Sequence, residues 1–337
     1  MAEKVLNQIF ADLREVMGTR YPSRGKLTRV RLLRHVPKRD YVAYDLRVDF
    51  KDGTERLVAK MYRSGRCGGN ARTTAQIETA NLQYVHRTTM NTKLSGIPCL
   101  VGNFSDKCVV VTDKIYGPPL QSLIMKVALL PHSADGGSLA LAASRAGKWL
   151  RSFHRATADL PEPFDADTLM ASLAVLCENC RARGLDPVTS KILLDSAHDV
   201  LSHCDRVLPS SAVLSNFTPL SVIVTEDGVG FSDFSKMKCR GNSLEDVAMF
   251  VASVEALGKY PFCAGGMVSQ IQESLSHAYG LTASETGTVY VLKMKILLEM
   301  FVQGRTGSNG FQNGMWSNVM RRAMRHSVPR PLARIVA

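Results

Sequence analysis

The spacing of apolar residues changes along the chain, and this change limits the possible folds more than any other feature. Between residues 28 and 62, short segments rich in Val, Leu and Tyr alternate with turn residues, and a Lys-Asp-Gly-Thr turn at residues 51–54 separates two of them. Such segments are typical of antiparallel strands. From Leu139 onward, apolar residues recur mainly at helical spacing. The sequence therefore predicts an α+β protein with a small β-rich N-terminal part and a larger helical C-terminal part.

The same spacing predicts where the individual elements lie. Strands are predicted over residues 28–33, 41–50, 56–62, 109–115, 212–214, 222–224 and 230–233. Helices are predicted over residues 5–17, 74–89, 139–158, 166–183, 188–204, 244–257, 267–279 and 288–302. A Gly-Pro-Pro run at residues 117–119 separates the two parts. We therefore expect an N-terminal lobe over residues 1–115, a helical C-terminal lobe over residues 116–320 that carries a short hairpin, and a basic tail over residues 321–337.

Length and composition restrict the class of protein. A chain of 337 residues is long enough for two domains, and its apolar share of 45% excludes disorder as the main state. The sequence holds no apolar stretch of membrane-spanning length and no signal-peptide pattern, so we expect a cytoplasmic protein with reduced cysteines. Cys177 and Cys180 have a C-x-x-C spacing, but no second pair or histidine cluster follows, and we interpret them as helical thiols rather than zinc ligands.

The net charge of +12 is concentrated at the two ends of the chain. Residues 1–66 hold 16 Lys or Arg against 8 Asp or Glu, and residues 300–337 hold six Arg and no acid. The stretch from Val16 to Arg39 contains eight cations and no acid. Two interpretations remain open: a solvated basic face, or a surface for an anionic partner such as a phosphorylated ligand or an anionic membrane surface. Nucleic acid is the least favoured partner, because no nucleic-acid-binding signature is present.

Three groups of residues follow one another in a characteristic order. Residues 213–224 have the sequence V-L-S-N-F-T-P-L-S-V-I-V, residues 231–234 read F-S-D-F, and residues 245–248 read E-D-V-A. Together they resemble the catalytic and metal-binding region of the aminoglycoside phosphotransferase family and its choline-kinase-like relatives, usually written H-G-D-F-x-P-x-N-V-L-V, I-D-F and D-x-A. The resemblance covers about residues 28 to 260. It implies a two-lobed protein-kinase-like fold.

The resemblance also implies roles for individual residues. Lys60 would neutralise the phosphates of ATP and Glu78, on the next helix, would hold it, while Asp233 would ligate Mg²⁺. Asp246 would brace the catalytic loop by accepting backbone hydrogen bonds. Each role has a structural alternative: a surface ion pair for Lys60 and Glu78, a turn residue for Asp233, and an acid at a helix N-terminus for Asp246.

Several positions depart from the family pattern. Asn216 stands where the family has its catalytic Asp, and an amide cannot accept the proton that an attacking hydroxyl loses. Ser221 stands at the second metal-ligand position, normally Asn, and its short hydroxyl reaches less far. The phosphate loop over residues 35–40 contains no glycine, so its backbone amides cannot approach phosphates closely, although Lys38 and Arg39 offer positive charge instead.

These departures leave two functional hypotheses. The favoured one is a pseudokinase with a partly retained nucleotide site, weak ATP binding and an impaired Mg²⁺ site, which acts by binding a small molecule or another partner. The alternative is an active ATP-dependent kinase for a hydroxyl of an aminoglycoside-, choline- or sugar-like molecule. Loss of the base, the second metal ligand and the loop glycines all point to the first.

Overall fold

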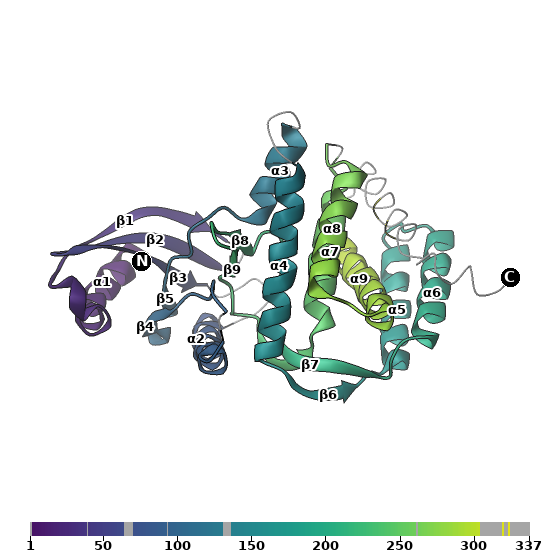
Figure 1. The fold of residues 1–337 in the computed structure, drawn as a ribbon, viewed down its shortest axis with the longest axis horizontal. Coiled ribbons are helices and arrows are strands. Elements are labelled where there is room, and N and C mark those ends of the chain that lie inside the picture. Colours follow the sequence, from purple (N-terminus) through teal and green to yellow (C-terminus); the bar gives the residue numbers. More distant parts are fainter. Residues whose placement is uncertain are drawn as a thin grey trace. The chain divides into compact units, whose positions relative to one another are not determined.

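The computed structural model describes residues 2–38, 40–63, 70–92, 94–130, 136–260 and 262–303, together with Val319 and Ala323. Its strands and helices confirm the predicted α+β class (Figure 1). Contacts between residues divide the chain into two compact units. The N-terminal unit comprises Met1–Gly117 and Gly230–Cys239, and the helical unit comprises Pro118–Val229 and Arg240–Ala337.

The N-terminal unit is built around a five-stranded sheet in the order β1-β2-β3-β5-β4, in which every neighbouring pair is antiparallel. The strands are β1 (Leu27–Pro37), β2 (Tyr41–Phe50), β3 (Gly53–Tyr62), β4 (Leu100–Phe104) and β5 (Val109–Asp113). Two helices accompany the sheet, α1 (Ala2–Arg20) and α2 (Ala71–Thr89). A short 3₁₀ turn, η1 (Pro22–Arg24), links α1 to β1, and a second, η2 (Ser105–Lys107), links β4 to β5.

Strand β2 shows how the sequence separates the two faces of this sheet. Its even-numbered residues from Val42 to Phe50 are buried in a hydrophobic cluster with Ile9, Leu13 and Met17 of α1. Its odd-numbered residues project to the opposite face, because successive side chains alternate along a strand. The register pairs Ala43 with Lys60 across β3, so Lys60 lies on this second face.

The segment Gly230–Cys239 belongs to the N-terminal unit, although the sequence pattern assigned it to the helical part. The side-chain amide of Asn81 on α2 donates to the backbone carbonyls of Phe234 (2.8 Å) and Met237 (2.9 Å). The amide of Phe231 also donates to the carbonyl of Gly96 at 2.9 Å. These bonds join residues that are more than 130 positions apart, which no local pattern reveals.

The helical unit contains seven helices in its described part: α3 (Leu120–Leu129), α4 (Gly136–Ala156), α5 (Ala166–Arg181), α6 (Pro187–Ser202), α7 (Leu244–Leu257), α8 (Gly265–Tyr279) and α9 (Ala283–Gln303). A sheet of β6 (Asp159–Pro163), β7 (Val207–Val213) and β10 (Lys238–Asn242) has β7 at its centre. The hairpin is formed by β8 (Val222–Val224) and β9 (Val229–Phe231). Gly147 permits close packing of α4 on α8, because a Cβ atom there would lie 2.4 Å from the carbonyl oxygen of Leu275.

Four elements were not predicted: β4, β6, β10 and α3. Strand β6 reads D-L-P-E-P, and its two prolines make the sequence look like a loop. The strand nevertheless pairs with β7 at the edge of its sheet. The predicted basic tail over residues 321–337 lies outside the described residues except at Ala323.

None of the described helices is long and apolar enough to cross a membrane. Seven of the eight cysteines lie in the described part of the chain, and none of these forms a disulfide. Cys177 and Cys180 are buried on α5, and burial raises the pKa of their thiols to about 11 and about 12. No group of described His, Cys, Asp and Glu side chains has the arrangement of a metal site.

Candidate active site

Lys60 and Glu78 form a buried ion pair in the N-terminal unit. Lys60 is 3% exposed and Glu78 is fully buried, and Lys60 Nζ lies 2.5 Å from Glu78 Oε1. Lys60 also donates to the carbonyl oxygen of Ser232 at 2.5 Å, while the hydroxyl of Tyr62 donates to the other oxygen of Glu78. Burial lowers the pKa of Lys60, but the negative charges of Glu78 and Asp233 outweigh this effect, so the net shift of the Lys60 pKa is upward. Lys60 is therefore held as a cation.

Asp233 lies next to this pair, on the segment that Asn81 anchors. Its Oδ1 accepts a hydrogen bond from the hydroxyl of Ser235 at 2.7 Å. Burial alone raises the pKa of Asp233, but attraction to Lys60 and the bonds from Ser235 outweigh it, and the net pKa is lowered. Asp233 is thus held as a carboxylate. The segment is fixed to α2 at a second point, because the amide of Phe234 donates to Glu78 at 3.3 Å.

The residues that follow the turn between β1 and β2 stand close to this pair. Lys60 Nζ lies 5.4 Å from the centre of the Tyr41 ring, a cation–π contact. Burial raises the pKa of the Tyr41 hydroxyl to about 12. Asp40 forms an ion pair with Lys236 at 3.5 Å. Lys38 is exposed, and Arg39 lies outside the described residues. The Tyr41 ring therefore lies against Lys60, and the neighbouring Asp40 pairs with Lys236.

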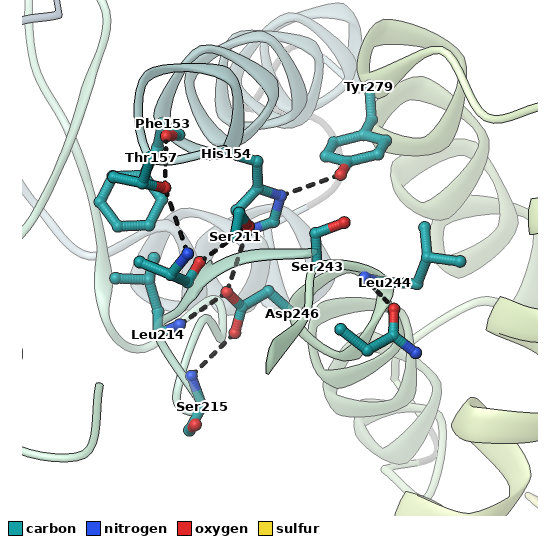
Figure 2. Close-up of polar contacts among 12 residues, drawn as sticks. Phe153, His154, Thr157, Ser211, Leu214, Ser215, Ser243, Leu244, Asp246 and Tyr279 are labelled. Atoms are coloured by element: carbon teal, nitrogen blue, oxygen red, sulfur yellow. Dashed lines mark hydrogen bonds and ion pairs between the residues drawn. The ribbon is translucent and has the colours of Figure 1, made fainter. Parts of the chain in front are cut away.

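In the helical unit, Asp246 at the start of α7 holds the loop that follows β7. Its Oδ2 accepts from the amide of Leu214 at 2.7 Å, and its Oδ1 accepts from the amide of Ser215 at 2.8 Å (Figure 2). Asp246 is fully buried. Charge-assisted bonds to backbone amides are among the stronger hydrogen bonds in proteins, so Asp246 fixes the backbone immediately before Asn216.

His154 of α4 supports Asp246 from the other side. His154 Nε2 lies 3.1 Å from Asp246 Oδ2, and His154 Nδ1 lies 2.9 Å from the hydroxyl oxygen of Tyr279 (Figure 2). In a neutral imidazole, Nε2–H donates to the carboxylate and Nδ1 accepts from Tyr279. Burial raises the pKa of the Tyr279 hydroxyl to about 12. Through these two contacts His154 links α4, α7 and α8.

The loop itself carries Asn216 and Ser221. Ser215, which precedes Asn216, has a backbone φ of +58°. The hydroxyl oxygens of Ser221 and Thr218 lie 3.1 Å apart, and the amide of Ser221 donates to the carbonyl of Thr218 at 2.9 Å. The Ser221 side chain is thus engaged within its own turn.

The structure brings the predicted site residues together in two groups, one in each unit. Lys60, Glu78 and Asp233 form the first group. Asp246 and the loop that bears Asn216 and Ser221 form the second. The sequence analysis missed Tyr41, Tyr62 and Asn81. Asn81 lies three residues after Glu78, on the same face of α2, and this helical spacing is the one signal that pointed to it.

Comparison with known proteins identifies the fold through solved structures and not through sequence similarity. No protein-family model and no curated protein sequence matches the chain. Among solved structures, glucosamine kinase in complex with glucosamine, ADP and inorganic phosphate is 12% identical with a TM-score of 0.54, over 90% of this chain and 94% of the other. A putative fructosamine-3-kinase from Thermobifida fusca is 16% identical with a TM-score of 0.52, over 94% of this chain and 98% of the other. The chain has the protein-kinase-like fold.

A third structure with this protein-kinase-like fold carries both a nucleotide analogue and an acceptor. It is a thermostable mutant of the aminoglycoside phosphotransferase APH(4)-Ia in a ternary complex with AMP-PNP and hygromycin B. It is 14% identical with a TM-score of 0.51, over 90% of this chain and 97% of the other. The fold predicted from the ordered motifs is therefore confirmed.

Proposed function

We propose that the protein is a pseudokinase that keeps part of a nucleotide site and acts by binding a small molecule or another partner. The observation that carries this proposal is the buried Lys60–Glu78 ion pair beside Asp233, in a chain that has Asn216 at the catalytic aspartate position. The pair supplies a fixed positive charge for phosphates, and Asp233 supplies a carboxylate for Mg²⁺. These groups support binding, and Asn216 removes the base.

The expected loss of rate follows from the chemistry of the amide. General-base catalysis contributes about 10²–10⁴-fold, or roughly 3–5 kcal/mol of barrier. Asn216 can orient a hydroxyl but accepts no proton from it. The hydroxyl of Ser221, engaged with Thr218, is a weaker second metal ligand than an amide oxygen.

The β1–β2 turn is expected to weaken nucleotide binding further. The Asp40 carboxylate repels phosphates, and the Tyr41 ring contacts Lys60. Lys60 has three N–H donors, of which Glu78 and Ser232 use two. One donor then remains to meet a phosphate beside the Tyr41 ring. We therefore propose weak ATP binding in which Mg²⁺ contributes little.

A thermal-shift assay with ATP, ADP and GTP, each with and without Mg²⁺, tests the proposal. A dissociation constant near 1 mM would raise the melting temperature by roughly 1–2 °C at several millimolar nucleotide, nearly equally with and without the metal. Asp40→Ser should increase this shift, because it removes a negative charge. Asp52→Ser, at an exposed turn of the same sheet, is the matched control.

Two outcomes would contradict this proposal. A rise of many degrees that requires Mg²⁺ would indicate an intact metal site. No response to any nucleotide, in wild type and in Asp40→Ser, would reject the retained nucleotide site and leave a protein that acts through other ligands.

An active kinase for a small-molecule hydroxyl is the second candidate. The observation that favours it is the loop geometry, since Asp246 still holds the two amides that precede Asn216. By their names, the similar structures include kinases of glucosamine and fructosamine. Incubation with ATP, Mg²⁺ and glucosamine, fructosamine or hygromycin B separates the candidates. Several turnovers per second with any of them would favour the kinase.

A further inference from the structure

Besides the loop that Asp246 braces, the helical unit contains an open pocket of about 200 Å³. One side of the pocket is formed by α4, and the other by β7, the start of α7 and the turn between α8 and α9. Its polar lining includes Arg151, Arg155, Ser210, Ser243 and Tyr279. None of these side chains has a role in the proposed nucleotide site.

Ser210 gives the first sign that the pocket binds something. This residue is 3% exposed, and its hydroxyl oxygen has no hydrogen-bond partner in the structure. A buried polar group without a partner costs about 1–3 kcal/mol. Ser210 lines the pocket, and an acceptor atom that displaced the atoms now covering its hydroxyl would satisfy it.

Two arginines give the second sign. Arg151 and Arg155 are four residues apart on α4 and therefore project from the same face of the helix. Within the described part of the chain, neither forms an ion pair. Gly280 makes room for Arg151, because a Cβ atom there would lie 2.5 Å from its Nη1 atom, and the φ of +78° at this residue also favours glycine.

One acid, Glu285, also lines the pocket. Its carboxylate accepts from the amide of Thr282 at 2.8 Å, and its own amide donates to the Thr282 hydroxyl at 3.1 Å. This reciprocal pair is a capping box at the N-terminus of α9. Glu285 thus already has a structural role, and the two arginines leave the lining with a net positive charge.

We propose that this pocket binds a phosphate group, either free phosphate or the phosphate of a small phosphomonoester. Guanidinium groups bind phosphate oxygens through paired hydrogen bonds, and hydroxyl groups such as that of Ser210 add single ones. The volume is sufficient for one phosphate with a small substituent. The site is separate from Lys60 and does not depend on the proposed nucleotide binding.

The occupant would lie close to the network that supports the catalytic loop. His154 and Tyr279 also line the pocket, and both belong to the chain of contacts that ends at Asp246 (Figure 2). A phosphate in this place is therefore two side chains away from the amides of Leu214 and Ser215.

Isothermal titration of the full chain with inorganic phosphate at constant ionic strength tests this proposal. We expect saturable binding to one site and at least tenfold weaker binding in Arg155→Gln and in Arg151→Lys, which keeps the charge but loses the paired geometry. Lys148→Gln, an exposed cation on the same helix, is the control and should bind as wild type does. Ser210→Ala should weaken phosphate binding while leaving the melting temperature of the free protein unchanged or higher, which a purely structural serine would not do.

Parallel titrations identify the ligand class. Tighter binding of glycerol 3-phosphate than of phosphate would support a phosphomonoester, and equal affinities would support free phosphate. The proposal is overturned if phosphate does not bind, if acetate binds as tightly as phosphate, or if Arg155→Gln and Lys148→Gln bind phosphate equally.

Discussion

Ser215 adopts a backbone conformation that L-amino acids rarely occupy, with a φ of +58°. Its hydroxyl oxygen is also buried without a hydrogen-bond partner. Both features cost stability, since the left-handed region costs a non-glycine residue about 1–2 kcal/mol. The hydrogen bonds that the amides of Leu214 and Ser215 donate to Asp246 hold the loop in this conformation against that cost.

Replacement of Ser215 by glycine should therefore stabilise the protein. We expect the free energy of unfolding to rise by roughly 0.5–1 kcal/mol, because glycine adopts this φ without a steric penalty. Urea denaturation measures the change. Ser152→Gly, on the exposed surface of α4, is the control and should have the opposite sign, because glycine destabilises helices. Equal destabilisation by both variants would show that the Ser215 side chain is needed where it stands.

Asn216 is the residue on which the catalytic prediction depends. If the missing general base at Asn216 limits the rate, Asn216→Asp, alone or with Ser221→Asn, should raise ATP turnover by one or more orders of magnitude. A coupled assay for ADP release measures this change, and Asn179→Asp on the exposed face of α5 controls for added charge. Unchanged turnover in the double variant would mean that the lost base does not limit the rate.

Some of the candidate site was predictable at the level of single residues, and some was not. Lys60, Glu78 and Asp233 were found because their order and spacing along the chain follow a known pattern. Ser210 carries no such signal, because its lack of a hydrogen-bond partner arises only when β7, α4 and α9 come together. The contact between Tyr41 and Lys60 also depends on the register between β2 and β3. An alternating pattern of apolar and polar residues does not determine that register.

At the scale of elements, a cluster of charges around Asp45 ties β1, β2 and β3 to Lys114, the residue that follows β5. Asp45 is 7% exposed and lies 2.7 Å from Arg56, 2.6 Å from Lys114 and 3.3 Å from Arg34. Burial raises the pKa of Asp45, but Arg56 and Lys114 outweigh it, so the net pKa is below the ordinary value of 3.8. The carboxylate therefore stabilises the fold at any pH above 3.8, and this contribution is lost as the pH falls through the lowered pKa.

Asp45→Asn should remove this pH dependence. At pH 7 we expect a loss of about 1–3 kcal/mol, because three cations lose their charged partner. As the pH falls below 3.8, the melting temperatures of wild type and variant should converge. Melting curves from pH 7 to pH 2.5 test this, with Asp52→Asn in the exposed β2–β3 turn as the control. Parallel profiles for wild type and Asp45→Asn would show that Asp45 is not the group that titrates.

For the whole molecule, the basic stretch from Arg20 to Arg39 is less uniform than its sequence indicates. Three of its arginines pair with acids of β2 and β3: Arg24 with Glu55, Arg31 with Asp49 and Arg34 with Asp45. Arg24 and Glu55 form a one-to-one pair, whereas Asp49 is shared with Arg47 and Asp45 is shared with Arg56 and Lys114. Lys26, Arg29 and Lys38 are exposed, and within the described residues no ion pair involves them. Arg20 is also exposed and outside any ion pair within the described residues, so it adds to the charge that these three offer an anionic partner.

A triple variant with Lys26, Arg29 and Lys38 changed to Gln should bind anionic surfaces less strongly. We expect wild type to be retained on anionic vesicles or on a phosphorylated matrix at low salt and released as salt rises, because the screening length falls from about 10 Å at 0.1 M to about 3 Å at 1 M. The control changes Lys126, Lys148 and Lys191 to Gln, which alters the net charge equally. Equal retention of both triple variants would show that the stretch from Arg20 to Arg39 is a solvated basic surface and not a binding surface.

The predicted α+β fold came from the spacing of apolar residues, whereas the place of residues 230–239 in the N-terminal unit did not follow from that spacing. Strand β6 was missed because of its prolines. The segment Gly230–Cys239 was placed in the helical part by its position along the chain, while Asn81 and Glu78 bind it to α2. Hydrogen bonds between residues far apart in the sequence determine to which unit such a segment belongs. They leave no periodic pattern in the sequence.

These long-range bonds have a consequence for protein synthesis. The amide of Asn81 binds the carbonyl of Met237, 156 positions later in the chain. A ribosome that adds about 5–20 residues per second needs roughly 8–30 s to make that stretch. Throughout this interval Glu78 and Asn81 lack partners that they have in the finished protein. The N-terminal unit, which is translated first, thus completes its folding only after much of the helical unit has been made. Nascent chains stalled before residue 237 expose the face of α2 that carries Glu78 and Asn81 to chaperones and proteases.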